Sequence, residues 1–241
     1  MSAATRASER GGPGEAAEDF LKGVYALRHS GRPVSTSELA AHLKISDAAV
    51  TKMARRLDGL GLVRHTPYRG ISLTPEGERL ALEVLRHHRL LELFLAEYLG
   101  YDWAGVHAEA ERLEHAVSPD FVERVDRALG HPAADPHGDP IPTAAGELPE
   151  LRLDRLSDLA AGRVATVRRV LAQEEPVLRY LAELGLVPGA SLRVLEVAPL
   201  GGPITVRLGD ARRALVRDLA AAILVRADAP PGRDDGHQTP G

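Results

Sequence analysis

Two helix-start signals lie close together in the N-terminal part of the chain, and they constrain the local fold more than any other feature. Ser35 precedes Glu38 by three residues, which is the capping-box pattern of a helix start. Ser46 begins a second helical segment that reaches Leu60 and is followed by Gly61, a residue suited to a left-handed helix cap. Two helices joined by so short a connection predict a helix-turn-helix.

Elements on either side extend this motif. Two strands at 62–65 and 70–74 are predicted downstream, around a turn at 66–69. An upstream helix is predicted from apolar residues at helical spacing, namely Phe20, Leu21, Val24, Tyr25 and Leu27. Helix, helix, helix and hairpin in this order predict a winged helix-turn-helix over residues 16–80.

The next part of the chain is predicted to be all-helical, over residues 81–130. It would contain the end of a nearly continuous helix at 76–99 and two further helices at about 104–117 and 119–129. Their apolar surface exceeds what short helices can bury among themselves. We therefore expect a homodimer formed through this domain.

The C-terminal half is predicted to hold a linker and a small β domain. Residues 131–161 contain five prolines and are predicted to be a linker. Residues 162–227 are predicted to form an SH3-like β-barrel, with one helix at 175–184 and strands at 164–170, 192–197, 204–208, 214–217 and 223–226. The tails, 1–15 and 228–241, are predicted to be disordered. The predicted fold class is a multidomain α+β protein.

Composition excludes several classes of function. The chain has no cysteine, which excludes disulfides, a thiolate nucleophile and a cysteine-ligated zinc site. No apolar run approaches the roughly 18–20 residues that span a bilayer, and no signal-peptide core is present, so we expect no membrane partner and a cytoplasmic location. Residues 32–80 carry eight Lys/Arg and five Asp/Glu, whereas 101–127 carry three and seven. This asymmetry permits a phosphate-facing module beside a cation-binding one.

The second helix of a helix-turn-helix enters the major groove of DNA, and its first residues touch base edges. Small side chains at its start would permit close approach, and Ser46 and Lys52 could hydrogen-bond bases. Arginines later in the helix and in the wing would contact phosphates. The predicted DNA-binding residues are Ser46, Ala48, Ala49, Thr51, Lys52, Arg55, Arg56, Arg64 and Arg69. A winged helix used for protein contact is the alternative.

Residues 106–115 contain a group of potential metal ligands. On a continuous helix, His107, Glu111, Glu114 and His115 would share an arc of about 100°. They would extend over about 12 Å, which is too long for one mononuclear site and suits two neighbouring ones. His88 and Glu92 form a further pair on one helix face. Paired histidines and carboxylates on two consecutive helices predict metal binding; a solvated charged face is the alternative.

Three other functions fit parts of the pattern. A carboxylate–histidine metal site could support hydrolysis. The chain shows no nucleophile motif and no glycine-rich phosphate loop, so we expect neither an enzyme nor a small-molecule substrate. A winged-helix regulator that senses a small organic ligand stays open at this point, as does a metal-buffering or adaptor protein that does not bind DNA.

Several segments in fixed order resemble the diphtheria toxin repressor family of iron- and manganese-dependent transcriptional regulators. The segments are Glu18–Lys22, Ser46–Val50, Leu73–Gly77, Arg86–Leu90, Val106–His115 and His137–Pro142. The resemblance covers residues 16–142. It extends more loosely to 162–227, where Leu181–Gly189 is similar to the SH3-like domain of iron-transport accessory proteins. It implies a dimeric repressor of metal-uptake genes that binds double-stranded operator DNA.

The resemblance also implies two metal sites in each subunit. The primary site would use Asp19, Glu111, Glu114 and His115. The ancillary site would use His88, Glu92 and His107, with Glu174 as a weaker candidate.

Two positions bear on the metal. Iron-responsive members of the family carry methionine and cysteine where this chain has Asp19 and Glu111. Carboxylates suit hard ions such as Mn²⁺, whereas sulfur donors favour softer ones. We therefore expect Mn²⁺, with Fe²⁺ as the alternative and Co²⁺, Zn²⁺ or Cd²⁺ as substitutes in vitro. Lys22 stands where the manganese regulators have a second glutamate, so separate sites are expected rather than a bridged pair.

Overall fold

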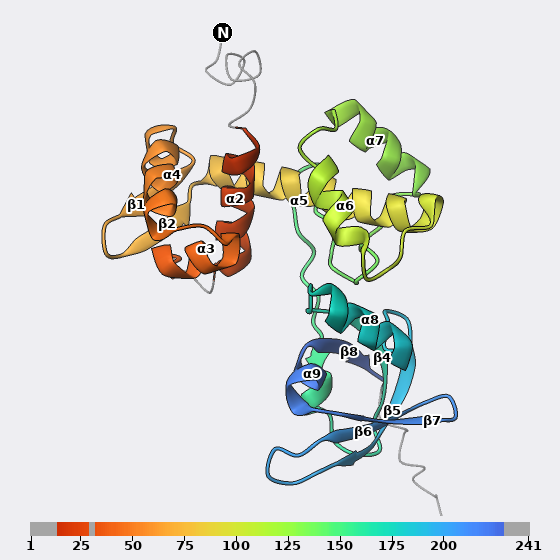
Figure 1. Cartoon of the computed structure of the whole chain (residues 1–241). Coiled ribbons are helices and arrows are strands. Elements are labelled where there is room, and N and C mark those ends of the chain that lie inside the picture. Colours follow the sequence, from red (N-terminus) through yellow and green to blue (C-terminus); the bar gives the residue numbers. More distant parts are fainter. Residues whose placement is uncertain (1–13, 29–31, 229–241) are drawn as a thin grey trace, which may run out of the picture. The chain divides into compact units, whose positions relative to one another are not determined.

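The computed structural model describes residues 14–28 and 32–228, which divide into two units. The first unit comprises the residues up to 94, together with 108–132 and 141–149; the second comprises 95–107, 133–140 and the residues from 150 onward (Figure 1). Apart from residues 14, 15 and 228, the predicted tails lie outside the described residues. Gly14 and Glu15 belong to the start of a helix, so the folded part begins slightly earlier than predicted.

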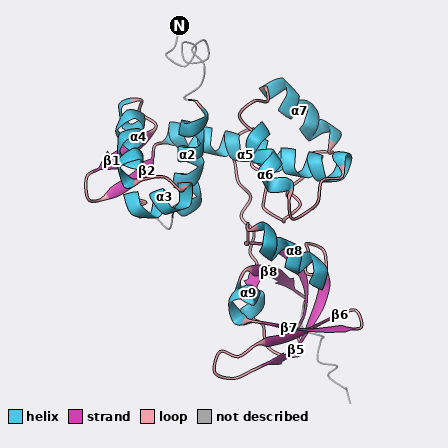
Figure 2. Cartoon of the chain, in the orientation of Figure 1, coloured by secondary structure: helices cyan, strands magenta, loops and turns pink. Residues whose placement is uncertain are grey.

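The winged helix-turn-helix elements occur in the predicted order (Figure 2). They are α2 Glu15–Leu27, α3 Thr36–Leu43, α4 Asp47–Gly59, β1 Val63–Thr66 and β2 Gly70–Leu73. Ser35 and Glu38 form a complete capping box at α3, and the Ser46 side chain accepts a hydrogen bond from Ala49 N at the start of α4. Gly61 has the expected left-handed conformation, with φ of 72°. Local capping chemistry thus explains both helix starts.

One apolar core holds these elements together. β1 and β2 pair antiparallel from Val63 opposite Leu73 to Thr66 opposite Gly70, and this pairing forms the wing. The side chains of α2, α3, α4 and the wing meet in a cluster that includes Phe20, Leu21, Leu39, Leu57 and Ile71, all fully buried. This shared core orients α4 with its polar face outward.

Helix α5, Pro75–Leu99, follows directly and confirms the predicted long helix. Its start is tied to the end of the α4–β1 connection. The Thr74 hydroxyl donates to Gly61 O at 2.7 Å and accepts from Gly77 N at 3.1 Å. A Cβ built at Gly77 would lie 1.9 Å from Leu62 O, so the backbones approach too closely for any side chain there.

The helix expected at 104–117 is shorter than predicted. α6 covers Val106–Leu113 only, and the chain then turns before α7, Pro119–Ala128. Ser118 caps α7 with an extended backbone, and the residue before a proline avoids helical geometry. The prediction of a helix through residue 117 was wrong beyond Leu113, because residues 114–117 form a turn and a bend. The helical domain of this unit has its own small core, which includes Leu90, Leu93, Val122, Val125 and Ile141.

The second unit contains a six-stranded antiparallel sheet with strand order β3-β8-β4-β5-β6-β7. Its elements are β3 Asp154–Arg155, the 3₁₀ turn η1 Leu156–Asp158, β4 Val164–Val170, α8 Glu175–Leu184, β5 Ser191–Val197, β6 Ile204–Leu208, β7 Ala211–Leu215, α9 Arg217–Ala221 and β8 Ile223–Ala227. Their inward-facing side chains form one core. The sheet agrees with the predicted SH3-like domain.

Two predictions in this unit need correction. The strand expected at 214–217 lies at 211–215, because Gly209 and Asp210 form a two-residue hairpin loop that sets its register against β6. Arg217 instead begins α9, a second helix that was not predicted.

The predicted linker at 131–161 is also not uniform. Asp135, His137 and Asp139 are buried, and Val170 N donates to His137 O at 2.9 Å. Leu156 and Leu159 belong to the domain core. Proline-rich segments are therefore built into the second unit by backbone hydrogen bonds, a feature that composition does not reveal. Among the described residues, no helix is long and apolar enough to cross a membrane.

Candidate metal centre and nucleic-acid interface

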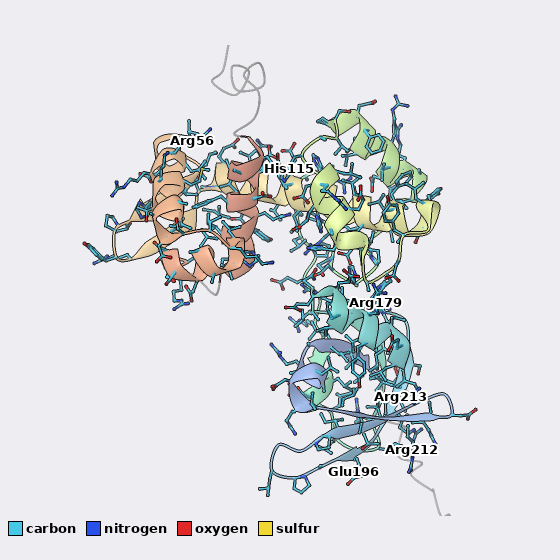
Figure 3. All side chains as sticks on the ribbon, in the orientation of Figure 1. Arg56, His115, Arg179, Glu196, Arg212 and Arg213 are labelled. Atoms are coloured by element: carbon cyan, nitrogen blue, oxygen red, sulfur yellow. The ribbon has the colours of Figure 1, made fainter. Side chains whose placement is uncertain are left out.

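The side chain of His115 lies at the centre of a cluster of carboxylates in the first unit (Figure 3). Its Nδ1 is 2.7 Å from Glu18 Oε2, and its Nε2 is 3.0 Å from Asp19 Oδ1 and 3.3 Å from Glu114 Oε1. One imidazole therefore contacts carboxylates from two separate parts of the chain.

Asp19, Glu114 and His115 can each offer one ligand atom, and these three atoms lie within 4.8 Å of one another. Asp19 lies on α2, whereas Glu114 and His115 lie in the turn that follows α6. The predicted primary ligands converge here through tertiary packing rather than through one helix face, since α6 ends at Leu113. The site thus joins the DNA-binding helices to the helical domain.

Lys22 places a cation among these groups. Its Nζ contacts Glu114 Oε1 directly and lies 4.0 Å from Glu111 Oε1. Lys22 is one turn after Glu18 and Asp19 on α2, so it faces the same side of the helix. Only 19% of its side chain is exposed. The lysine ammonium neutralises part of the charge of these carboxylates.

His88 and Glu92 form the second predicted pair, on α5. His88 Nε2 is 3.1 Å from Glu92 Oε1, and both side chains are buried. His88 Nδ1 contacts Glu114 Oε2. Glu114 therefore connects the predicted ancillary pair directly to the predicted primary group.

The pKa shifts follow from burial and from these contacts. Burial raises the pKa of Asp19, which His115 and Lys22 only partly offset. Burial also favours a higher pKa for Glu114, but hydrogen bonding and charge from His88, followed by Lys22, outweigh it and lower the pKa. For His88 and His115, burial favours a lower pKa, but their carboxylate neighbours raise it. The neighbouring carboxylates thus favour the protonated form of both imidazoles, and a metal ion would compete with these protons for the ring nitrogens.

The other predicted ligands are placed less directly. Glu111 is on α6 with about half of its side chain exposed, near Lys22 rather than in the group of three. His107 is the second residue of α6 and the last residue of its segment of the second unit. Glu174 also belongs to the second unit, where it is exposed and precedes α8. Their participation stays a prediction.

Glu18 was missed as a possible participant. The Glu18 carboxylate is hydrogen-bonded to Nδ1 of His115. This bond orients the ring so that Nε2 faces Asp19 and Glu114. Carboxylates commonly fix ligand histidines in this way. The available sequence signal was an acidic residue beside a predicted ligand, but neighbours on a helix point about 100° apart, and only the tertiary structure shows both reaching one imidazole.

The predicted DNA-binding residues lie on α4, at its N-cap and on the wing. All are exposed except Thr51, which is half-buried and donates to Asp47 O at 2.9 Å. The Ser46 hydroxyl accepts a hydrogen bond from Ala49 N and thereby caps α4. Arg56 projects from α4, near the C-terminal end of this helix (Figure 3). The buried residues Val50, Ala54 and Leu57 hold the opposite side of α4 in the core.

The chain matches three known domain families in sequence. Residues 14–71 match the iron dependent repressor, N-terminal DNA binding domain. Residues 74–143 match the iron dependent repressor, metal binding and dimerisation domain, and residues 155–227 match the FeoA domain. Together these matches cover both units.

Known proteins of this kind align over almost their whole length. The iron-dependent repressor IdeR of Mycobacterium tuberculosis is 34% identical over 220 residues, covering 86% of this chain and 95% of IdeR. The diphtheria toxin repressor of Corynebacterium diphtheriae is 28% identical over 219 residues, covering 86% and 95%.

Solved structures show the same similarity. A manganese-dependent transcriptional repressor in complex with manganese is 40% identical with a TM-score of 0.79, covering 87% of this chain and 98% of that one. The structure of ScaR with bound Cd²⁺ is 34% identical with a TM-score of 0.73, covering 87% and 98%. The chain therefore belongs to the family of metal-dependent transcriptional repressors, non-enzymatic proteins that include IdeR and the diphtheria toxin repressor.

Proposed function

We propose that this repressor responds to manganese(II), binds operator DNA as a homodimer in the cytoplasm, and represses genes of metal uptake. The observation that carries the proposal is the convergence of Asp19 with Glu114 and His115. Similarity to a repressor in complex with manganese supports it.

The donor atoms fit a divalent cation of this kind. Two carboxylate oxygens and one imidazole nitrogen lie within 4.8 Å of one another, close enough to bind one ion, and no sulfur is among them. Such donors suit Mn²⁺, Fe²⁺ and Zn²⁺, and the absence of sulfur makes the set more suitable for the hard ion Mn²⁺ than a sulfur-containing set would be. Because Fe²⁺ and Zn²⁺ bind more tightly in general, selectivity for Mn²⁺ would come from geometry and from the availability of each metal. Glu111 is proposed to add a third carboxylate. A bound ion would supply the positive charge that Lys22 and the imidazole protons supply without it.

His88 and Glu92 are proposed to hold a second, ancillary ion together with His107, and Glu174 stays the weaker candidate. Glu114 contacts His88 and His115 at once. Loading one site would therefore free or reorient Glu114 and affect the other site. This supports coupled binding of two ions rather than independent binding.

Metal binding would act on DNA affinity by selecting one arrangement of the domains. Asp19 belongs to the DNA-binding helices, and Glu114 and His115 to the helical domain. An ion held by all three fixes α2 against the turn after α6 and shifts the population toward that arrangement. In a dimer, this would set the two α4 helices about 34 Å apart, which is one turn of DNA.

The α4 face would then read operator DNA. Ala48 and Ala49 permit close approach to the major groove, and Lys52 is long enough to reach a base edge. Arg55, Arg56, Arg64 and Arg69, all exposed, would contact phosphates and set the position on the duplex.

The test is a titration of Mn²⁺, Fe²⁺ and Zn²⁺ into the purified chain while binding to duplex DNA from its own promoter is followed at fixed salt. We expect tight binding only with metal, strongest with Mn²⁺ at micromolar concentration. Metal-independent binding would instead favour a regulator that senses an organic ligand. Absence of DNA binding under every condition would assign the winged helix to protein contact.

The matched variants are Asp19→Ala and Glu15→Ala, both on α2. Asp19→Ala removes a predicted ligand and should abolish the metal response of DNA binding. Glu15→Ala removes an exposed carboxylate one turn earlier and should respond like the wild type. An Asp19→Ala protein that binds metal and operator normally would contradict the proposed coupling.

A further inference from the structure

The outer face of the C-terminal sheet carries a row of arginines on three neighbouring strands. Arg193 on β5 is paired in register with Arg207 on β6, which is paired with Arg212 on β7. Directly opposed residues of an antiparallel sheet project from the same face. All three side chains are exposed, whereas their strand neighbours Leu192, Val194 and Val206 are buried in the core. We call Arg193, Arg207 and Arg212 the arginine row.

By itself, the arginine row lowers the stability of the sheet. Like charges directly opposite one another destabilise a sheet. Among residues 14–28 and 32–228, none of the three arginines has an Asp or Glu partner within ion-pair distance, although Glu196 lies on the same face, opposite Thr205. Figure 3 shows Arg212 and Glu196 on this sheet. Within the described part of the chain, the three guanidinium groups are thus exposed and available to an anionic ligand.

The surrounding domain has the same character. Residues 155–227 contain eleven arginines, no lysine and seven acidic residues, which gives a net charge of +4, whereas the whole chain has −4. Arg226, which pairs with Thr166 on β4, is exposed and continues the positive face on β8. Exclusive use of arginine suits recognition of phosphate, because its planar guanidinium forms two parallel hydrogen bonds to phosphate oxygens.

We propose that the arginine row binds the phosphate backbone of duplex DNA. Neighbouring strands lie roughly 4.8 Å apart, so the row spans about 10 Å. Phosphates of one DNA strand recur about every 3.4 Å along the helix axis, so a row of this length covers about three phosphate-to-phosphate steps. The contact carries affinity without reading sequence. It gives the C-terminal domain a direct role in operator binding, beside the winged helix.

This inference rests on the proposed DNA-binding function, and its test separates the two. DNA binding by the full chain with saturating Mn²⁺ is measured over a series of KCl concentrations. The row variant is Arg193→Gln with Arg207→Gln and Arg212→Gln. The control variant, Arg152→Gln with Arg168→Gln and Arg179→Gln, removes the same charge from other exposed positions of the same unit.

The dependence of log affinity on log salt has a slope of about −0.9 per phosphate contact. The row variant should lose roughly two to three units of this slope per protomer and bind at least tenfold more weakly near 0.15 M salt. The loss should be equal on the operator and on a scrambled duplex. The control variant should keep the wild-type slope, and a row variant with lysines in place of the arginines should keep most of it.

Equal slopes for the wild type and the row variant would overturn the inference while leaving the proposed function intact. An equal loss in the control variant would also overturn it, because the effect would then be one of net charge. Wild-type protein that fails to bind DNA at all would contradict the proposed function itself. The single variant Arg207→Gln, at the centre of the row, repeats the test with a smaller change, and the melting temperature of both variants should not fall, because repulsion is removed.

Discussion

Lys22 is the residue that distinguishes the candidate centre from a simple set of acidic ligands. Its ammonium group contacts Glu114 and lies near Glu111, so it occupies part of the space and charge that a metal ion requires. A divalent ion that binds Glu114 must displace this contact. At the proposed metal site, Lys22 would therefore set a threshold for metal binding.

Lys22→Gln should raise the affinity for Mn²⁺ roughly tenfold, which is about 1.4 kcal/mol. The reason is that the ion no longer competes with an ammonium group for Glu114. Isothermal titration calorimetry measures the change. Lys44→Gln, which removes an exposed lysine from the same domain, is the control. Unchanged affinity in Lys22→Gln would show that Lys22 leaves Glu114 without cost or that Glu114 is not a ligand.

The choice of metal is predicted to depend on two residues of unequal weight. Replacing Asp19 by Met and Glu111 by Cys introduces softer donors and should shift activation from Mn²⁺ toward Fe²⁺. Asp19→Met alone should have the larger effect, because Asp19 belongs to the converging group and Glu111 is half exposed. The readout is the ratio of metal concentrations that half-saturate DNA binding under anaerobic conditions. A constant ratio would show that the ligand side chains at positions 19 and 111 do not control selectivity.

At the level of elements, the start of α5 is where the wing meets the long helix. Thr74 links Gly61 and Gly77, and Gly77 lies against the carbonyl of Leu62. These contacts explain the residue types at two positions of the Leu73–Gly77 motif. Its threonine caps a helix, and its glycine permits a close backbone approach.

Gly77→Ala should lower the free energy of unfolding by about 1–3 kcal/mol, because the added methyl group overlaps Leu62 O and the helix must shift. Chemical denaturation measures the loss. Gly59→Ala serves as the control, since a Cβ there meets no atom within 4 Å. If both variants unfold alike, α5 adjusts freely at this contact and the explanation of the motif is wrong.

The turn after α6 shows what an element boundary can change. Sequence periodicity extended the helix through Val117 and placed four ligands on one arc. The structure ends α6 at Leu113, and residues 114–117 form a turn and a bend before Ser118 caps α7. Glu114 and His115 then point toward α2 and α5 from a turn. Of the four residues, Glu114 and His115 lie in one group with Asp19, and they do so from a turn rather than from a shared helix face.

For the whole molecule, the two units should respond differently to metal. Asp19, Glu114 and His115, which converge, all belong to the first unit. Mn²⁺ at 100 times its dissociation constant should stabilise that unit by about 2.7 kcal/mol, and a chelator should remove the gain. Differential scanning calorimetry should show the larger metal-dependent shift in the transition of the first unit, and a smaller shift of the second unit through the proposed ligand His107. A second transition that moves equally with metal would assign ligands such as Glu174 to the site, and Glu174→Gln would then reverse its shift.

The sequence by itself determined the order of the domains, the capped helices around α4 and the residue types of the candidate centre. These features depend on short-range rules: capping bonds close within four residues, and apolar periodicity follows from local geometry. The family resemblance added the grouping of Asp19 with residues almost a hundred positions away.

Only the tertiary structure decided how those residues meet. It placed Lys22 and Glu18 in the cluster, joined His88 to Glu114, and aligned Arg193, Arg207 and Arg212 across three strands. It also built much of the proline-rich segment into the second unit. Such contacts depend on packing and strand register between distant parts of the chain, and no local pattern encodes them.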